Sequence, residues 1–220
     1  MSFLLLVKDE IEGFYKSKVM IFLWIGLPLL TILFHFWYSL QGGEIPFTSL
    51  SAIITSSIGG TLASVMLTVS IINEKIQHVY DLFLVRPVKR WNIILSKFLA
   101  VYVCIIVASL LSLLLGLIID YAIIGRVSGT ILNDTTTSLA TSFSMMAISS
   151  SAGVLIGVVA PSVLVGVVLI IYGGNQISGL SAIPTILNVS NATVFTVTFG
   201  IITTCVMLVL ATLLFNRKQL

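Results

Sequence analysis

The few side chains in this 220-residue chain that could do chemistry are concentrated in one short stretch. Residues 80–91, YDLFLVRPVKRW, hold four of the charged side chains, and Glu74, Lys75 and Lys97 lie close by. On both sides the sequence turns apolar over a length that could cross a membrane. Such a cluster could contact a partner protein, or its basic residues could serve only to fix the orientation of the chain in a membrane.

No other group of residues indicates catalysis or metal binding. His35 and His78 are far apart in sequence, and we expect them on opposite sides of a membrane. Cys104 and Cys205 both fall inside apolar runs, without the spacing of a metal or redox site. We therefore expect no catalytic residue, no metal site and no cofactor in this chain.

The composition indicates an integral membrane protein. Hydrophobic residues make up 58% of the chain and charged residues only 9%, whereas a soluble domain carries about 25% charged residues. No charged residue lies between Asp134 and Arg217, so that interval could not form a soluble surface. We expect an all-α membrane protein in a single transmembrane domain that covers residues 1–220.

Six runs are apolar enough to cross a bilayer. The fifth is interrupted by YGGNQISG, residues 172–179, so we expect a helix break at Gly173, Gly174, Asn175 and Gln176. Asp134, before three threonines, is expected to be the N-cap of the fourth helix. The runs are residues 19–40, 50–72, 93–119, 138–160, 163–183 and 194–215.

Residues 1–18 are too polar to span a membrane. Phe3, Val7, Ile11 and Phe14 recur at helical spacing, with charged residues between them. This pattern predicts an amphipathic helix at the cytoplasmic interface. The alternative is a frayed tail that only orients the first span.

The basic residues predict the orientation. With a cytoplasmic N-terminus, ten Lys and Arg side chains fall on the cytoplasmic side and only Arg126 on the other. Both termini and the loop at residues 73–92 are therefore expected in the cytoplasm.

The loop itself contains a short helical pattern. Pro87 should end this helix, because the residue before a proline avoids the α region. Leu82 and Val85 are apolar side chains on its otherwise polar cytoplasmic face, and they are candidates for a partner contact. The apolar stripe of this helix, which can face the membrane or the helix bundle, consists of Ile76, Val79, Tyr80, Phe83 and Leu84.

This loop resembles the cytoplasmic loop of type-2 ABC exporter permeases, which have an N-terminal interfacial helix, six spans and a coupling helix between spans two and three. The Gly-Thr of the family pattern is replaced here by His78–Val79. The positions that match are Glu74, Asp81, Phe83–Leu84, Pro87, Lys89–Arg90 and Lys97.

The resemblance implies a permease that carries no nucleotide site and docks separate cytoplasmic ATPase subunits, which hold ATP and Mg²⁺. The chain agrees, since it contains no G-x-x-x-x-G-K-[ST] sequence. The resemblance also implies a dimer, homomeric or with a similar permease, in the plasma (inner) membrane of a prokaryote, and no nucleic-acid partner. The implied ATPase-coupling residues are Glu74, His78, Asp81, Leu82, Val85, Pro87, Lys89, Arg90 and Lys97.

The sequence indicates only the general class of the cargo. Spans rich in Ser and Thr but poor in charge suit an amphipathic or hydrophobic cargo, such as a peptide, a drug or a lipid, moved along the dimer seam.

The fourth span has a face of small residues. Ser149, Gly153 and Gly157 form this face, for packing either inside one subunit or between subunits.

Two alternative functions stay open. A gradient-coupled carrier usually has ionisable groups at mid-membrane, which these spans lack, although a broken helix can bind sodium through its carbonyls. A membrane scaffold or immunity component without transport is the second alternative. Copurification with an ATPase, or a sodium requirement, would separate these functions.

Overall fold

The computed structural model describes residues 3–39, 47–77, 90–124, 129–180, 183 and 192–217, and the regular structure in these residues is helical. The α-helices are α1 (Phe3–Tyr15), α2 (Lys18–Ser39), α3 (Phe47–Ile76), α5 (Arg90–Ile124), α6 (Gly129–Val159), α7 (Val163–Leu169), α8 (Asn175–Gly179) and α10 (Ala192–Arg217), with a π-helix, η1 (Ile170–Gly174), between α7 and α8.

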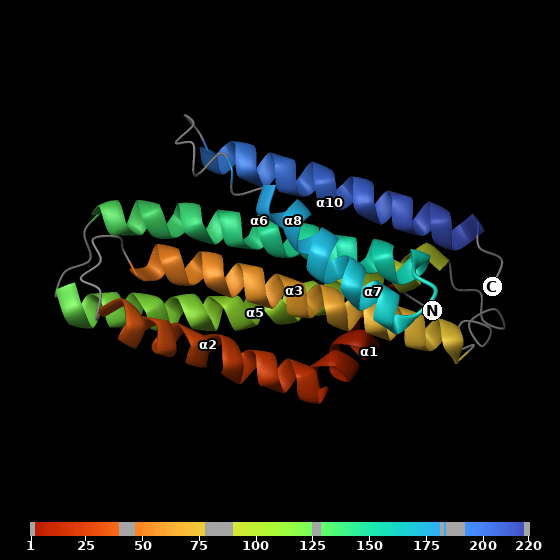
Figure 1. The fold of residues 1–220 in the computed structure, drawn as a ribbon, viewed down its shortest axis with the longest axis horizontal. Helices are drawn as coiled ribbons and strands as arrows, with labels where there is room; N and C mark the ends of the chain where they lie inside the picture. Colours follow the sequence, from red (N-terminus) through yellow and green to blue (C-terminus); the bar gives the residue numbers. More distant parts are fainter. Residues whose placement is uncertain are drawn as a thin grey trace.

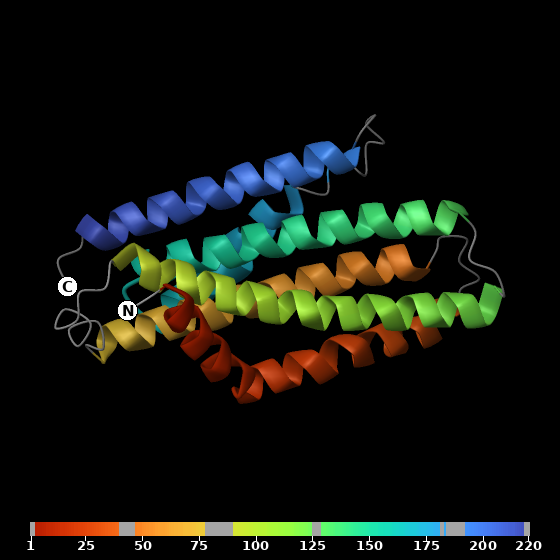
Figure 2. The same ribbon diagram turned by 180° about the vertical axis from the view of Figure 1, so that it is seen from behind.

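The long helices α2, α3, α5, α6 and α10 lie side by side along the long axis of the molecule (Figures 1 and 2). α6 packs against both α3 and α10, whereas α2 packs against α3 and α5. At one end of the bundle α3 ends, α5 begins and α10 ends (Figure 1). α1 lies in the same half of the bundle, packed on α5.

Four helices in the described part of the chain are long and apolar enough to cross a membrane. They are Ile54–Ile76, Trp91–Ile119, Thr135–Val159 and Thr193–Arg217. α1 and α2 pass the same test only as a pair, and they are bent by 68° at the junction between them. The helical structure and these four apolar helices confirm the expectation of an all-α, multi-pass membrane protein.

The fifth apolar run stays helical where we expected a break. α7 is followed directly by η1, and η1 by α8, so the helical path continues from Val163 to Gly179. The change to π-helical hydrogen bonding includes Gly173 and Gly174, and Asn175 and Gln176 begin α8. A π segment widens the helix locally by one residue per turn and is frequent at functional sites.

The helices extend beyond the apolar runs that located them. α6 begins at Gly129, so Asp134 lies inside the helix, and the prediction that it forms the N-cap is wrong. α3 continues to Ile76 and α5 begins at Arg90, so the ends of the expected 73–92 loop are helical. Hydropathy locates only the part of a helix that is apolar, and Ser, Thr, Asn and Asp can continue the helix past it.

The small-residue face of α6 packs against α3 within the chain. A Cβ on Gly153 would lie 2.6 Å from the Ser64 backbone, and one on Gly157 would lie 3.2 Å from Thr68 Cα. Ser149 lies against Gly60, and the Thr68 hydroxyl donates to the Gly153 carbonyl at 2.6 Å. The two backbones approach so closely that a larger side chain could not fit between them.

Candidate functional site

Among the residues that the structure describes, one charged side chain, Lys97, lies buried inside a candidate span. It belongs to the Trp91–Ile119 part of α5 and is only 4% exposed. A buried ammonium group away from water requires carboxylates or other acceptors to offset its lost hydration. The partners of Lys97 therefore define a site.

Lys97 joins three helices through two carboxylates. Its Nζ lies 2.6 Å from Glu74 Oε1 on α3 and 2.9 Å from Glu10 Oε1 on α1. The Ser70 hydroxyl donates to the same Glu74 oxygen at 3.1 Å, and Lys97 Nζ lies 5.9 Å from the centre of the Phe14 ring. We call these five residues the Lys97 cluster.

The Lys97 cluster has two carboxylates for one ammonium group. Burial raises the pKa of the Glu10 carboxyl above its usual value of 4.5, and the charges of Glu74 and Asp9 raise it further. The Lys97 ammonium acts in the opposite direction but does not reverse the shift. Folding therefore makes protonation of the Glu10 carboxyl easier.

Glu10 was not among the residues predicted from the sequence, although its position in α1 indicated a buried contact. The apolar stripe of α1 runs through Phe3, Val7, Ile11 and Phe14, and Glu10 falls in the same helical register. Glu10 is thus a charged residue on the face that packs against α5. A lone carboxylate on a packing face indicates a cation on the neighbouring element.

The Lys97 cluster joins the end of α3 to the beginning of α5, and these two helices flank the predicted coupling loop. Glu74 lies in the last turn of α3, and Lys97 lies about two turns into α5. Arg90 is the first residue of α5. The other predicted coupling residues lie outside the described residues: His78, Asp81, Leu82, Val85, Pro87 and Lys89.

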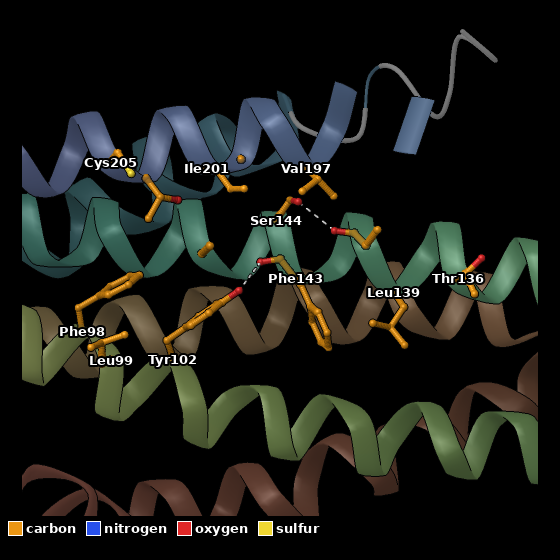
Figure 3. Close-up of a pocket in the computed structure, with 14 residues that line it drawn as sticks. Phe98, Leu99, Tyr102, Thr136, Leu139, Phe143, Ser144, Val197, Ile201 and Cys205 are labelled. Atoms are coloured by element: carbon orange, nitrogen blue, oxygen red, sulfur yellow. Dashed lines mark hydrogen bonds between the residues drawn. The ribbon is translucent and has the colours of Figure 1, made fainter. Parts of the chain in front are cut away.

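A separate cavity of about 590 Å³ lies between α5, α6 and α10 and is partly open to the surface. Phe98 and Tyr102 enter it from α5, Leu139 and Phe143 from α6, and Ile201 from α10 (Figure 3). Its wall is almost entirely apolar. No signal in the sequence singled out this cavity, because it is formed by three helices that are distant along the chain.

Within the described ranges, no three His, Cys, Asp or Glu side chains are grouped closely enough to hold a metal ion. No protein-family model and no curated protein matches the chain.

Proposed function

We propose that this chain is the transmembrane permease subunit of an ATP-driven ABC exporter. It moves an amphipathic or hydrophobic cargo out of the cell, and separate cytoplasmic ATPase subunits, which bind ATP and Mg²⁺, supply the energy. The proposal includes six spans, with α2 and the α7–η1–α8 segment adding to the four longest apolar helices. It also includes cytoplasmic termini, a dimer, and the plasma membrane of a prokaryote.

The observation that carries the proposal is the Glu74–Lys97 ion pair. An exporter of this kind must transmit force from a cytoplasmic loop to the helices that enclose the cargo path. The ion pair links the two helices that flank the loop, and Glu10 adds the N-terminal helix to the same joint. A displacement of the loop would then move α1, α3 and α5 together.

The loop residues in this proposal come from the sequence pattern. Leu82 and Val85 are the apolar contacts for the ATPase, with Asp81 adding a charge-assisted contact. Burial of two such side chains against a partner contributes about 1.5–3 kcal/mol each. Lys89 and Arg90 lie at the rim of that contact, where one charge contributes less than about 1 kcal/mol.

Copurification tests the proposal. The Leu82→Asp, Val85→Asp double variant should lose its cytoplasmic ATPase while still inserting into the membrane. Lys89→Ala is the matched control in the same loop and should retain most of the ATPase. An ATPase yield from the double variant equal to that of the wild type would show that the loop only sets topology, and a wild-type chain without any ATPase would favour a scaffold or a gradient-coupled carrier.

A further inference from the structure

The N-terminal helix α1 is joined to α2 through a hinge at Ser17. The Ser17 amide donates to the Phe14 carbonyl at the end of α1, and the Ser17 carbonyl accepts from the Met20 amide at the start of α2. The Ser17 hydroxyl also accepts from the Met20 amide at 3.2 Å, and so caps α2 independently of α1. Because the two helices are already bent by 68° at this point, α1 can change its angle there without unwinding α2.

The face of α1 that packs on α5 combines apolar contacts with one ion pair (Figure 2). Leu6 and Phe14 are 6% and 8% exposed, and between them Glu10 pairs with Lys97 at 2.9 Å. Of the 13 residues of α1, these two apolar side chains are the buried ones. The charge state of Glu10 therefore has a large influence on how firmly α1 is attached.

Docking of α1 changes the charge balance around Lys97. Without α1, Lys97 and Glu74 form a neutral pair at 2.6 Å, and the Ser70 hydroxyl donates to the same Glu74 oxygen at 3.1 Å. Docking with an ionised Glu10 adds a second carboxylate to the same ammonium group, so the site gains a net negative charge. The side chains of Glu10 and Glu74 are only 23% and 22% exposed, and little water remains to offset that charge. A protonated Glu10 keeps the docked site neutral.

The charges that act on Glu10 come from three helices. Burial is the largest cause that raises the pKa of the Glu10 carboxyl, and Glu74 on α3 and Asp9 on α1 raise it further, whereas Lys97 on α5 lowers it. No charge of α2 contributes. An undocked α1 has Glu10 in water with its ordinary pKa, so the docked helix binds the proton more tightly. Docking is therefore strongest at acid pH and weakens as the pH rises through the raised pKa.

We propose that α1 is a pH-dependent latch on the joint between α3 and α5. It docks on α5 with a proton bound at the two carboxylates that share Lys97, and it turns away about Ser17 when that proton is lost. Leu4 and Tyr15 are 77% and 54% exposed, and they give a released α1 an apolar edge that can lie on the bilayer surface. The inference concerns the regulation of the proposed coupling joint, and only its effect on transport rests on the proposed function.

Distances between spin labels test the latch. The purified full-length chain in nanodiscs, with Cys104→Ala and Cys205→Ala, carries nitroxide labels at Leu5→Cys on α1 and Val103→Cys on α5. Both positions are exposed, at 50% and 45%. Double electron–electron resonance should give one narrow distance at about pH 5 and a second, broader population at about pH 8. Each unit by which docking raises the pKa changes the docking equilibrium about tenfold, so we expect the undocked fraction to rise severalfold.

Two variants alter this pH dependence by different routes. Glu10→Gln keeps the site neutral at every pH, so α1 should stay docked, with one narrow distance under both conditions. Glu74→Gln leaves Glu10 alone with Lys97, so the same rise in pH should release less of α1 than in the wild type. Glu12→Gln, on the exposed face of α1, is the matched control and should behave like the wild type.

The same distances at both pH values in the wild type would overturn the inference. So would a pH-dependent release that persists in Glu10→Gln, that is abolished in Glu12→Gln, or that is as large in Glu74→Gln as in the wild type. Loss of the ATPase in the loop double variant should not change the distances, because the measurement uses this chain alone. Failure of the exporter proposal therefore leaves this result intact.

Discussion

Two adjacent residues of α5 face very different surroundings. Lys97 turns toward α1 and α3, where two carboxylates bind its ammonium group. Phe98 lines the cavity toward α6 and α10 and stacks on Tyr102, with 5.6 Å between ring centres. The same helix thus has a charged, tightly connected face and an apolar, incompletely filled face.

This difference shows how a helix in a membrane can be fixed on one side and adaptable on the other. Ion pairs between buried groups require particular partners at short distances, so the Lys97 cluster sets the relative positions of α1, α3 and α5. Apolar contacts are non-directional, so the cavity side tolerates different occupants. We expect mutations on the two faces to differ accordingly.

The largest effect should come from Lys97→Met. The substitution leaves Glu10 and Glu74 partly buried without their cation, and we expect it to lower the free energy of unfolding by about 2–4 kcal/mol. The value is below that for fully buried pairs, because the carboxylate side chains are 22–23% exposed. Detergent unfolding measures it, with Lys8→Met on the exposed side of α1 as control. Equal stability of the two variants would show that the cluster does not hold the helices together.

Substitutions that enlarge a side chain should also change stability differently on the two sides of α6. Gly153→Ala places a methyl group against the Ser64 backbone, and we expect a cost of about 1–3 kcal/mol from overpacking. Ala147→Leu adds more atoms but directs them into the cavity, so we expect a change of less than about 1 kcal/mol. Thermal unfolding of both variants checks this order, and the reverse order would mean that the cavity is already filled by packing.

Thr204→Val should have a smaller effect and the opposite sign. It replaces an unpartnered buried hydroxyl with a methyl group of similar size, so the chain should be stabilised by up to about 1 kcal/mol. Thr198→Val is the control, since it removes a hydroxyl that has partners. A clear loss of stability in Thr204→Val would mean that the hydroxyl has a partner in solution.

The smallest effect should be a change in pH dependence. Folding raises the pKa of Glu10 above 4.5, so the folded state binds its proton more tightly than the unfolded state. The stability due to Glu10 is therefore fully present below pH 4.5 and is lost as the pH rises through the raised pKa. Glu10→Gln should remove this decline, whereas Glu12→Gln, on the exposed face of α1, should retain it. A wild-type stability that rises over this window and does not respond to Glu10→Gln would contradict the assignment.

The sequence predicted what depends on local pattern. Apolar length located the long helices, and the charged positions Glu74 and Lys97 were identified on either side of the loop. The spacing of Gly153 and Gly157 predicted a face of close helix packing. The apolar runs and the glycine spacing are each set by residues within a few turns of one another, whereas Glu74 and Lys97 were singled out by the resemblance to the family pattern.

Features that depend on tertiary packing were not predicted. Glu10 was overlooked because its carboxylate has a partner only when α1 packs on α5 and brings it beside Lys97. The cavity between α5, α6 and α10 depends on how three helices that are distant along the chain pack together. No residue type in its wall indicates a cavity in the sequence. The helix boundaries near Asp134 were misplaced because polar residues continued the helix beyond the apolar run.

The most direct test of the central claim is a charge exchange across the joint between α3 and α5. The measured quantity is the ATPase copurified per mole of folded chain, with folding checked by size-exclusion chromatography. In a Glu10→Gln background, which removes the second carboxylate beside position 97, Glu74→Lys and Lys97→Glu should each reduce that amount strongly. The double exchange in that background, which restores an ion pair across the same two positions, should recover most of it. ATPase yields from the single variants equal to that of the wild type, or a double exchange no better than either single variant, would contradict the account.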